Sequence, residues 1–147
     1  MKLREDQVDA AVRGLASAVA KRDAAEQERL AAEARRAAHQ ATATGVRVAE
    51  GAALARGELS AADLARANAW EVRITSEHQA LVSELERVAA AEARAREAED
   101  NARGEVAQRE AGAQVVATDQ ARWHEALRKK AEGREEEAAE EAFRPRR

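Results

Sequence analysis

Histidine, the residue most often used for proton transfer and metal binding, occurs three times in this sequence. His39, His78 and His124 are far apart along the chain, whereas metal motifs such as HExxH place their ligands within one or two helical turns. There is no cysteine, so neither a thiolate ligand nor a thiol nucleophile is available. We therefore expect no metal site. His78 fits a polar position in a helix–helix interface, and His124 fits a solvent-exposed one.

The acidic and basic residues give equally little sign of catalysis or nucleic-acid binding. They number 28 and 25 and leave a net charge of -3, so no strong field would attract a polyanion. Neither GxxxxGK[ST] nor GxGxxG occurs, and a phosphate-binding loop is not expected. Glutamates on long helices without a pocket have no enclosed environment that would prepare them for acid–base catalysis. We expect no enzyme, no cofactor and no nucleic-acid partner.

Composition indicates long helices in place of a compact core. Phe, Trp and Tyr make up only 2% of the chain, most of the 45% hydrophobic residues are alanine, and the single proline is Pro145. Alanine is the strongest helix former, and such a chain buries a narrow stripe. Disorder is the alternative, which the periodicity disfavours. No apolar run approaches the roughly 20 residues that span a bilayer, and the start MKLREDQVDA lacks a signal-peptide pattern, so a cytoplasmic location without membrane insertion is expected.

Apolar residues in the first half follow a helical repeat that changes phase once. Val8, Val12, Leu15 and Val19 are spaced by four, three and four residues and predict one interface stripe. The next large residue, Leu30, begins a second phase, which indicates a stutter in the coiled coil. The expected interface then comprises Leu30, Ala34, Ala37, Ala41, Thr44, Val48 and Ala55.

The second half keeps one heptad register after a turn. Gly57 and the pair Ser60 and Asp63 predict a helix end followed by a capping box, with Asp in place of the usual Glu. The apolar positions then recur every seven residues in two series, and Glu92, Glu99, Arg109 and Gln120 interrupt them. The series are Ile74, Leu81, Val88, Ala95, Ala102, Val116 and Trp123, and His78, Leu85, Val106, Ala113 and Leu127.

These patterns predict an all-α fold, an elongated antiparallel two-helix coiled-coil hairpin that forms a single domain over residues 1–147. The helices are expected at about 4–56 and 61–143, with a turn at about 57–60 and Pro145 beyond the second helix. Because the second helix is longer, its part beyond about residue 118 should project with Trp123, Leu127 and Phe143 exposed. Trp70, Val72 and Ile74 follow the turn and fit either packing near the turn or an exposed docking site.

Two segments carry a resemblance to a known family. The first runs from Trp123 to Arg144 and contains Arg134-Glu135 and Glu140-Glu141; the second runs from Ile74 through His78 to Leu81. Together with two long helices joined near the middle, they resemble the YscO/FliJ family of type III secretion and flagellar export. The chain is identified as a member on this basis.

The resemblance implies a function as well as a fold. Members form an antiparallel two-helix coiled coil similar to the stalk of rotary ATPases, insert their joined termini into the hexameric secretion ATPase and link it to the export gate protein. Some also escort substrate chaperones. It implies a monomer at the cytoplasmic face of a secretion apparatus. The ATPase contact would include Trp123, Leu127, Arg134, Glu140, Glu141 and Phe143, and the gate or chaperone contact Trp70, Ile74, His78 and Leu81.

Two other readings stay open. The chain could be a structural coiled coil that scaffolds homodimers without an ATPase partner, in which case it should dimerise. An amphipathic helix on a lipid surface is a third reading, which the scarcity of Leu, Trp and Phe disfavours. The basic end FRPRR could contact phosphate or an acidic surface, although simple solubilising charge is the favoured explanation.

Overall fold

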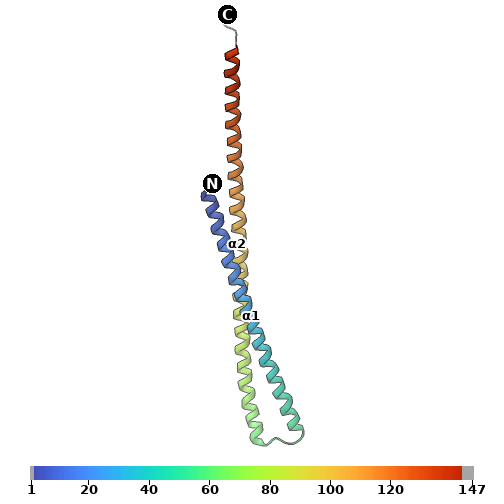
Figure 1. Ribbon diagram of the computed structural model, residues 1–147. Helices are drawn as coiled ribbons and strands as arrows, with labels where there is room; N and C mark the ends of the chain where they lie inside the picture. The colour runs from blue at the N-terminus through green and yellow to red at the C-terminus, as the bar shows by residue number, and fades with distance from the viewer. Residues whose placement is uncertain (1, 144–147) are drawn as a thin grey trace. The chain divides into compact units, whose positions relative to one another are not determined.

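A computed structural model describes residues 2–143 of the chain, and within that range it contains two helices and no strand (Figure 1). Helix α1 is Lys2–Ala55 and helix α2 is Ala61–Phe143. The all-α prediction is confirmed. Arg144 and Pro145 lie outside the described residues.

The turn between the helices is built on Gly57. This residue has φ +70°, a left-handed conformation that only glycine adopts without steric cost. Its N–H donates to the carbonyl of Leu54 at 3.0 Å, and the N–H of Glu58 donates to Ala53 at 3.0 Å. These two bonds form a Schellman motif, which satisfies carbonyls that the end of α1 would otherwise leave without donors.

The predicted capping box at the start of α2 is confirmed. The backbone N–H of Asp63 donates to the Ser60 hydroxyl at 3.2 Å, and the Asp63 carboxylate accepts from the backbone N–H of Ser60 at 2.8 Å. The Ser60 hydroxyl also donates to this carboxylate at 2.6 Å, and Arg66 pairs with it. These donors lower the pKa of Asp63 to about 2, with the Ser60 hydroxyl contributing most.

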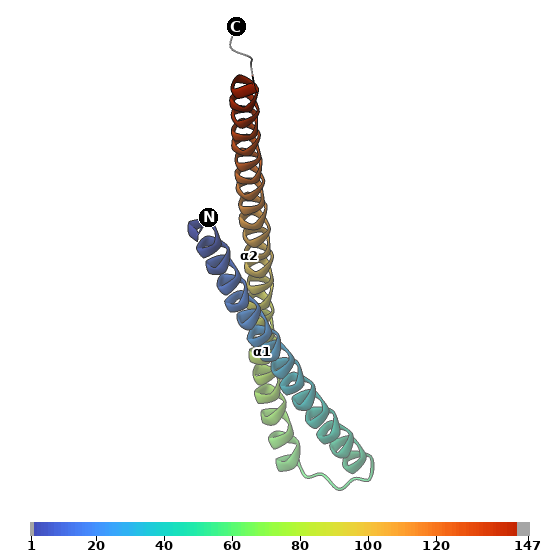
Figure 2. The same ribbon diagram turned by 45° about the horizontal axis from the view of Figure 1, so that its top comes forward.

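The chain forms two compact units. One, here called the hairpin unit, comprises Ala16–Asp100; the other, the terminal unit, comprises the residues up to Leu15 and those from Asn101 onward. In the hairpin unit α1 and α2 extend from the turn on the same side and run antiparallel to each other (Figure 2). Five side-chain pairs across the helices follow this antiparallel order. An α1 residue that lies nearer the turn pairs with an α2 residue that also lies nearer the turn. The five pairs are Arg22–Glu99, Arg29–Glu92, Arg35–Glu84, His39–Glu77 and Arg47–Glu71.

The interface stripe of α2 in the hairpin unit is the predicted one. Ile74 and Val88 are buried, and His78, Leu81 and Leu85 between them are half-buried. The same spacing of four and three continues through the residues that interrupt the apolar pattern. Those residues lie in the interface as well, because Glu92 and Glu99 are only 4% and 5% exposed.

The predicted interface stripe of α1 is wrong. Leu30 and Val48 are 44% and 67% exposed, and the smaller residues assigned to the same stripe, Ala34, Ala37, Ala41, Thr44 and Ala55, are exposed as well. The residues that face α2 instead keep one uninterrupted heptad register, so the hairpin unit contains no stutter. They are Ala18, Arg22, Ala25, Arg29, Ala32, Arg36, His39, Ala43, Val46, Glu50 and Ala53.

Close packing on alanine explains this choice of face. Ala32 and Ala43 are among the least exposed residues, at 1% and 3%, and small side chains allow two helix axes to approach toward the short end of the usual 8–10 Å. Two arginines of the same stripe, Arg22 and Arg29, reach carboxylates on α2, whereas the buried Nε of the third, Arg36, has no hydrogen-bond partner among the described residues. Large apolar side chains were therefore a misleading guide to the buried side of α1.

The terminal unit buries less. Ala11 is 8% exposed, and Val8 and Leu15 are half-buried, whereas Val12 is 46% exposed. In the predicted stripe of Val8, Val12, Leu15 and Val19, the interface position expected for Val12 is therefore taken by Ala11. On α2 the half-buried positions of the repeat continue as Val106, Arg109, Ala113 and Val116.

Candidate protein-binding surfaces

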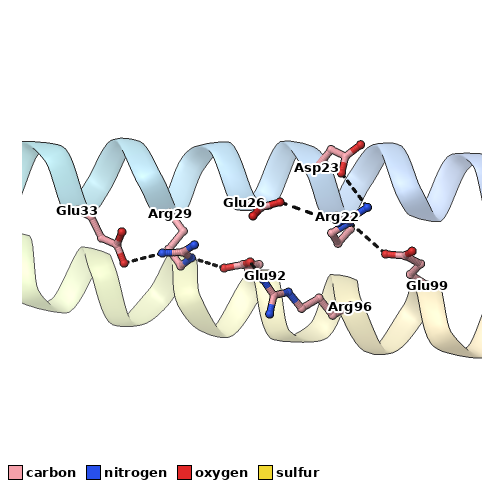
Figure 3. A network of polar contacts seen from close by, with 8 residues as sticks. All are labelled: Arg22, Asp23, Glu26, Arg29, Glu33, Glu92, Arg96 and Glu99. Atoms are coloured by element: carbon pink, nitrogen blue, oxygen red, sulfur yellow. Dashed lines mark hydrogen bonds and ion pairs between the residues drawn. The ribbon is translucent and has the colours of Figure 1, made fainter.

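Two ionic layers lie inside the helix interface of the hairpin unit (Figure 3). In the first, the Arg29 Nε donates to Glu92 Oε2 at 2.5 Å across the helices, and Arg96 donates to the other carboxylate oxygen at 2.5 Å. The second guanidinium edge of Arg29 reaches Glu33 at 2.6 Å. Both oxygens of the buried Glu92 carboxylate therefore have charged donors, which is the condition for burying a charge.

The second layer repeats the first one heptad away. Arg22 lies 3.1 Å from Glu99 across the helices and pairs on its own helix with Asp23 at 3.0 Å. Such pairs contribute little net stability, but removing one member leaves the other charge buried without a partner, which destabilises the fold. They fix the register of α1 against α2. The sequence carried a signal for them, since arginines at seven-residue spacing in one helix match glutamates at the same spacing in the other.

His39 and His78 meet in the interface nearer the turn. Their rings stack with centroids 6.2 Å apart and an angle of 28° between the planes. His39 Nε2 also lies 3.2 Å from a carboxylate oxygen of Glu77. Among residues 2–143 no group of three or more His, Asp or Glu side chains is arranged to hold a metal ion. The prediction that His78 lies at the interface is confirmed.

The four residues proposed for a gate or chaperone contact are mostly interface residues. Ile74 is buried, and His78 and Leu81 are half-buried in the α2 stripe. Trp70 is half-buried and shares a shallow groove near the turn with Val46 and Leu59. These positions favour packing over docking, and only the neighbouring Val72, at 68%, is strongly exposed.

Beside this groove an ion pair holds the ends of the two helices. Arg47 makes two hydrogen bonds to Glu71, at 2.6 and 2.8 Å. The bonds lower the pKa of Glu71, because they stabilise its ionised form.

The end of α2 presents the six residues proposed for an ATPase contact. Every residue from Thr118 to Phe143 is exposed except the half-buried Gly133. Trp123, Leu127 and Phe143 are 60%, 44% and 89% exposed. The ion pairs found here are local ones along the helix, such as Lys129 with Glu125 at 3.0 Å and Arg128 with Glu132 at 3.5 Å. They support the helix and leave its apolar side chains uncovered.

Helical geometry separates these six residues into two groups. At about 100° per residue, Leu127 lies about 40° around the helix from Trp123, whereas Phe143 lies about 160° away and Glu140 about 100° away. Phe143 therefore cannot share a docking face with Trp123. One face, here called the C-terminal stripe, continues the heptad positions of the α2 interface; it consists of Trp123, Leu127, Lys130, Arg134, Glu137 and Glu141.

Comparison of the chain with protein-family models, with curated proteins and with solved structures finds no match. The resemblance to the YscO/FliJ family therefore rests on the quoted segments and on the two-helix layout. Over residues 2–143, no helix is long and apolar enough to cross a membrane.

Proposed function

We propose that this chain is a non-enzymatic, protein-binding coiled coil, and that its partner at the end of α2 is a secretion ATPase. In this proposal the protein acts as a stalk or adaptor at the cytoplasmic face of a type III secretion apparatus and links the ATPase hexamer to the export gate protein. The YscO/FliJ resemblance supplies the identity of the partners, with substrate chaperones as further ones.

One observation carries the proposal. The C-terminal stripe occupies the heptad positions that α1 covers in the hairpin unit, yet all six of its residues are exposed. Trp123 offers the largest apolar surface of the stripe, and a buried Trp contributes strongly to protein interfaces. Interface positions of the heptad repeat that no helix of this chain covers are available to a helix of a partner protein.

The charges of the stripe define the partner further. Lys130 and Arg134 are followed by Glu137 and Glu141, so a complementary helix needs carboxylates beside the first pair and basic groups beside the second. The hairpin unit uses the same arrangement, in which interface arginines of one helix meet interface glutamates of the other. Apolar residues on the partner would cover Trp123 and Leu127.

Titration calorimetry of the full chain with the cognate secretion ATPase tests the proposal. Leu127→Asp should weaken binding at least tenfold, because it places a charge in an interface that excludes water. Ala121→Asp is the matched control, since it adds the same charge about 160° from Trp123 on the same exposed helix. Equal, full-strength binding by both variants would exclude the stripe as the contact.

A further inference from the structure

The outward side of α1 in the hairpin unit has no charged residue over a long stretch. From Leu30 to Ala55 the positions that point away from α2 are alanine or glycine, apart from Leu30, Thr44 and Val48. All of them are exposed. We call this surface the outer face of α1.

The charged residues of this stretch are confined to the side of α1 that faces α2 and to its two edges. Arg36 and Glu50 lie in the interface stripe, while Glu33, Arg35 and Arg47 lie at the edges. The corresponding outward side of α2 is charged, with the exposed Arg73, Glu86 and Arg87. Because 36% of the whole chain is charged, a charge-free helix side of this length indicates a surface that another helix covers.

We propose that the outer face of α1 binds the outer face of α1 in a second copy of this chain, antiparallel and centred near Ala41. The inference goes beyond the proposed function, because it concerns the hairpin unit and needs no ATPase, and it replaces the monomer that the family resemblance implies. Its first support is shape. An antiparallel pair centred there places Leu30 opposite Ala52 and Val48 opposite Ala34, so each large residue meets a small one.

Its second support is charge. On one edge of the face Glu33 and Arg47 are equally spaced about Gln40, and on the other Glu28 and Arg56 are equally spaced about Thr42. In an antiparallel pair each glutamate therefore lies opposite the arginine of the second copy. Glu33 and Arg47 keep their partners Arg29 and Glu71, so the second copy adds long-range complementarity without breaking an ion pair.

The size of the face sets the expected strength. A stretch of 26 residues from Leu30 to Ala55 is about 39 Å long, and at a helix width of about 10 Å it covers roughly 400 Å² on each copy. This is below the usual size of a stable interface. We therefore expect a reversible dimer with a dissociation constant in the low micromolar range or weaker.

Sedimentation equilibrium of the full chain over a wide concentration range tests the proposal. The weight-average mass should rise toward that of a dimer, and Ala41→Glu should weaken dimerisation at least tenfold, because the two introduced charges face each other. Ala90→Glu, on the exposed side of α2, is the matched control. Mixing Ala41→Glu with Ala41→Lys should restore the dimer.

Cysteine cross-linking gives a second readout, since the chain has no cysteine of its own. Ala41→Cys should form a disulfide-linked dimer on mild oxidation, and an equimolar mixture of Ala34→Cys and Val48→Cys should cross-link far more than either alone. A chain that stays monomeric at every concentration would overturn the proposal. A dimer whose dissociation constant is unchanged by Ala41→Glu would also overturn it. A third contradicting result is that the chain does not self-associate, while Ala41→Glu abolishes its binding to another protein or to lipid vesicles.

Discussion

The carboxylate of Glu92 accepts a hydrogen bond from Arg29 across the helix interface at 2.5 Å while only 4% of the residue is exposed. The partners are 63 residues apart in sequence, so this contact forms only when the two helices pack in one register.

Breaking this pair from one side should destabilise the hairpin unit. Arg29→Leu leaves the buried Glu92 carboxylate with Arg96 alone, and we expect the free energy of unfolding to fall by about 1–3 kcal/mol in urea titrations. Replacing both residues with leucine should restore most of that loss, because neither charge is then buried. Glu84→Ala breaks the more exposed pair with Arg35 and should cost less than about 1 kcal/mol. Equal losses in all three variants would contradict the burial argument.

The interface of α1 can be tested with two alanines two positions apart. Ala32 is 1% exposed, so Ala32→Leu should overpack the interface and cost about 1–3 kcal/mol. Ala34 is exposed, and Ala34→Leu should change the stability by less than about 0.5 kcal/mol. Urea unfolding at submicromolar protein concentration measures both stability changes. A larger loss in Ala34→Leu than in Ala32→Leu would support the predicted interface stripe that includes Leu30 and Ala34.

The buried side of α1 could not be predicted from the sequence, whereas that of α2 could. The α2 stripe was predictable because Ile74, Leu81 and Val88 are large and face α1, so size and burial agree. In α1 they disagree, since Leu30 and Val48 are exposed while Ala32 and Ala43 are buried and the stripe arginines are half-buried. Arg22 and Arg29 are accommodated there because a glutamate of α2 lies opposite each of them, and that relation is invisible until both registers are known. The local signals at Gly57 and Ser60 needed no such knowledge and were read correctly.

The turn glycine should be sensitive to substitution. Gly57→Ala forces a β-carbon into a left-handed conformation and should destabilise the chain by about 1 kcal/mol. Gly104→Ala is the control, because Gly104 is helical with no atom near a new β-carbon; it should stabilise by about 0.5–1 kcal/mol. Thermal melts of the two variants should therefore shift in opposite directions, and a common direction would argue against the turn geometry.

The cap of α2 should respond to acid. The pKa of Asp63 is about 2 in the folded chain, against 3.8 for a free carboxyl. A carboxyl with a lowered folded-state pKa stabilises the fold above its unfolded pKa, and this contribution is lost as the pH falls from about 4 to about 2. An NMR titration of the Asp63 carboxyl should have its midpoint near 2. In Ser60→Ala the midpoint should move toward 3.8, and an unchanged midpoint would exclude the Ser60 hydroxyl as the main cause.

Calorimetry with two aromatic variants tests the proposed function most directly. Trp123 lies in the C-terminal stripe, whereas Phe143 is more exposed but lies about 160° away around the helix. Trp123→Ala should weaken binding of the full chain to the cognate secretion ATPase at least tenfold, within the range of interface hot spots. Phe143→Ala should change it by less than about threefold, which is below the roughly 1 kcal/mol that only a minority of interface residues exceed on truncation to alanine. Full-strength binding by Trp123→Ala, with or without a loss in Phe143→Ala, would contradict the assignment of the C-terminal stripe as the ATPase contact.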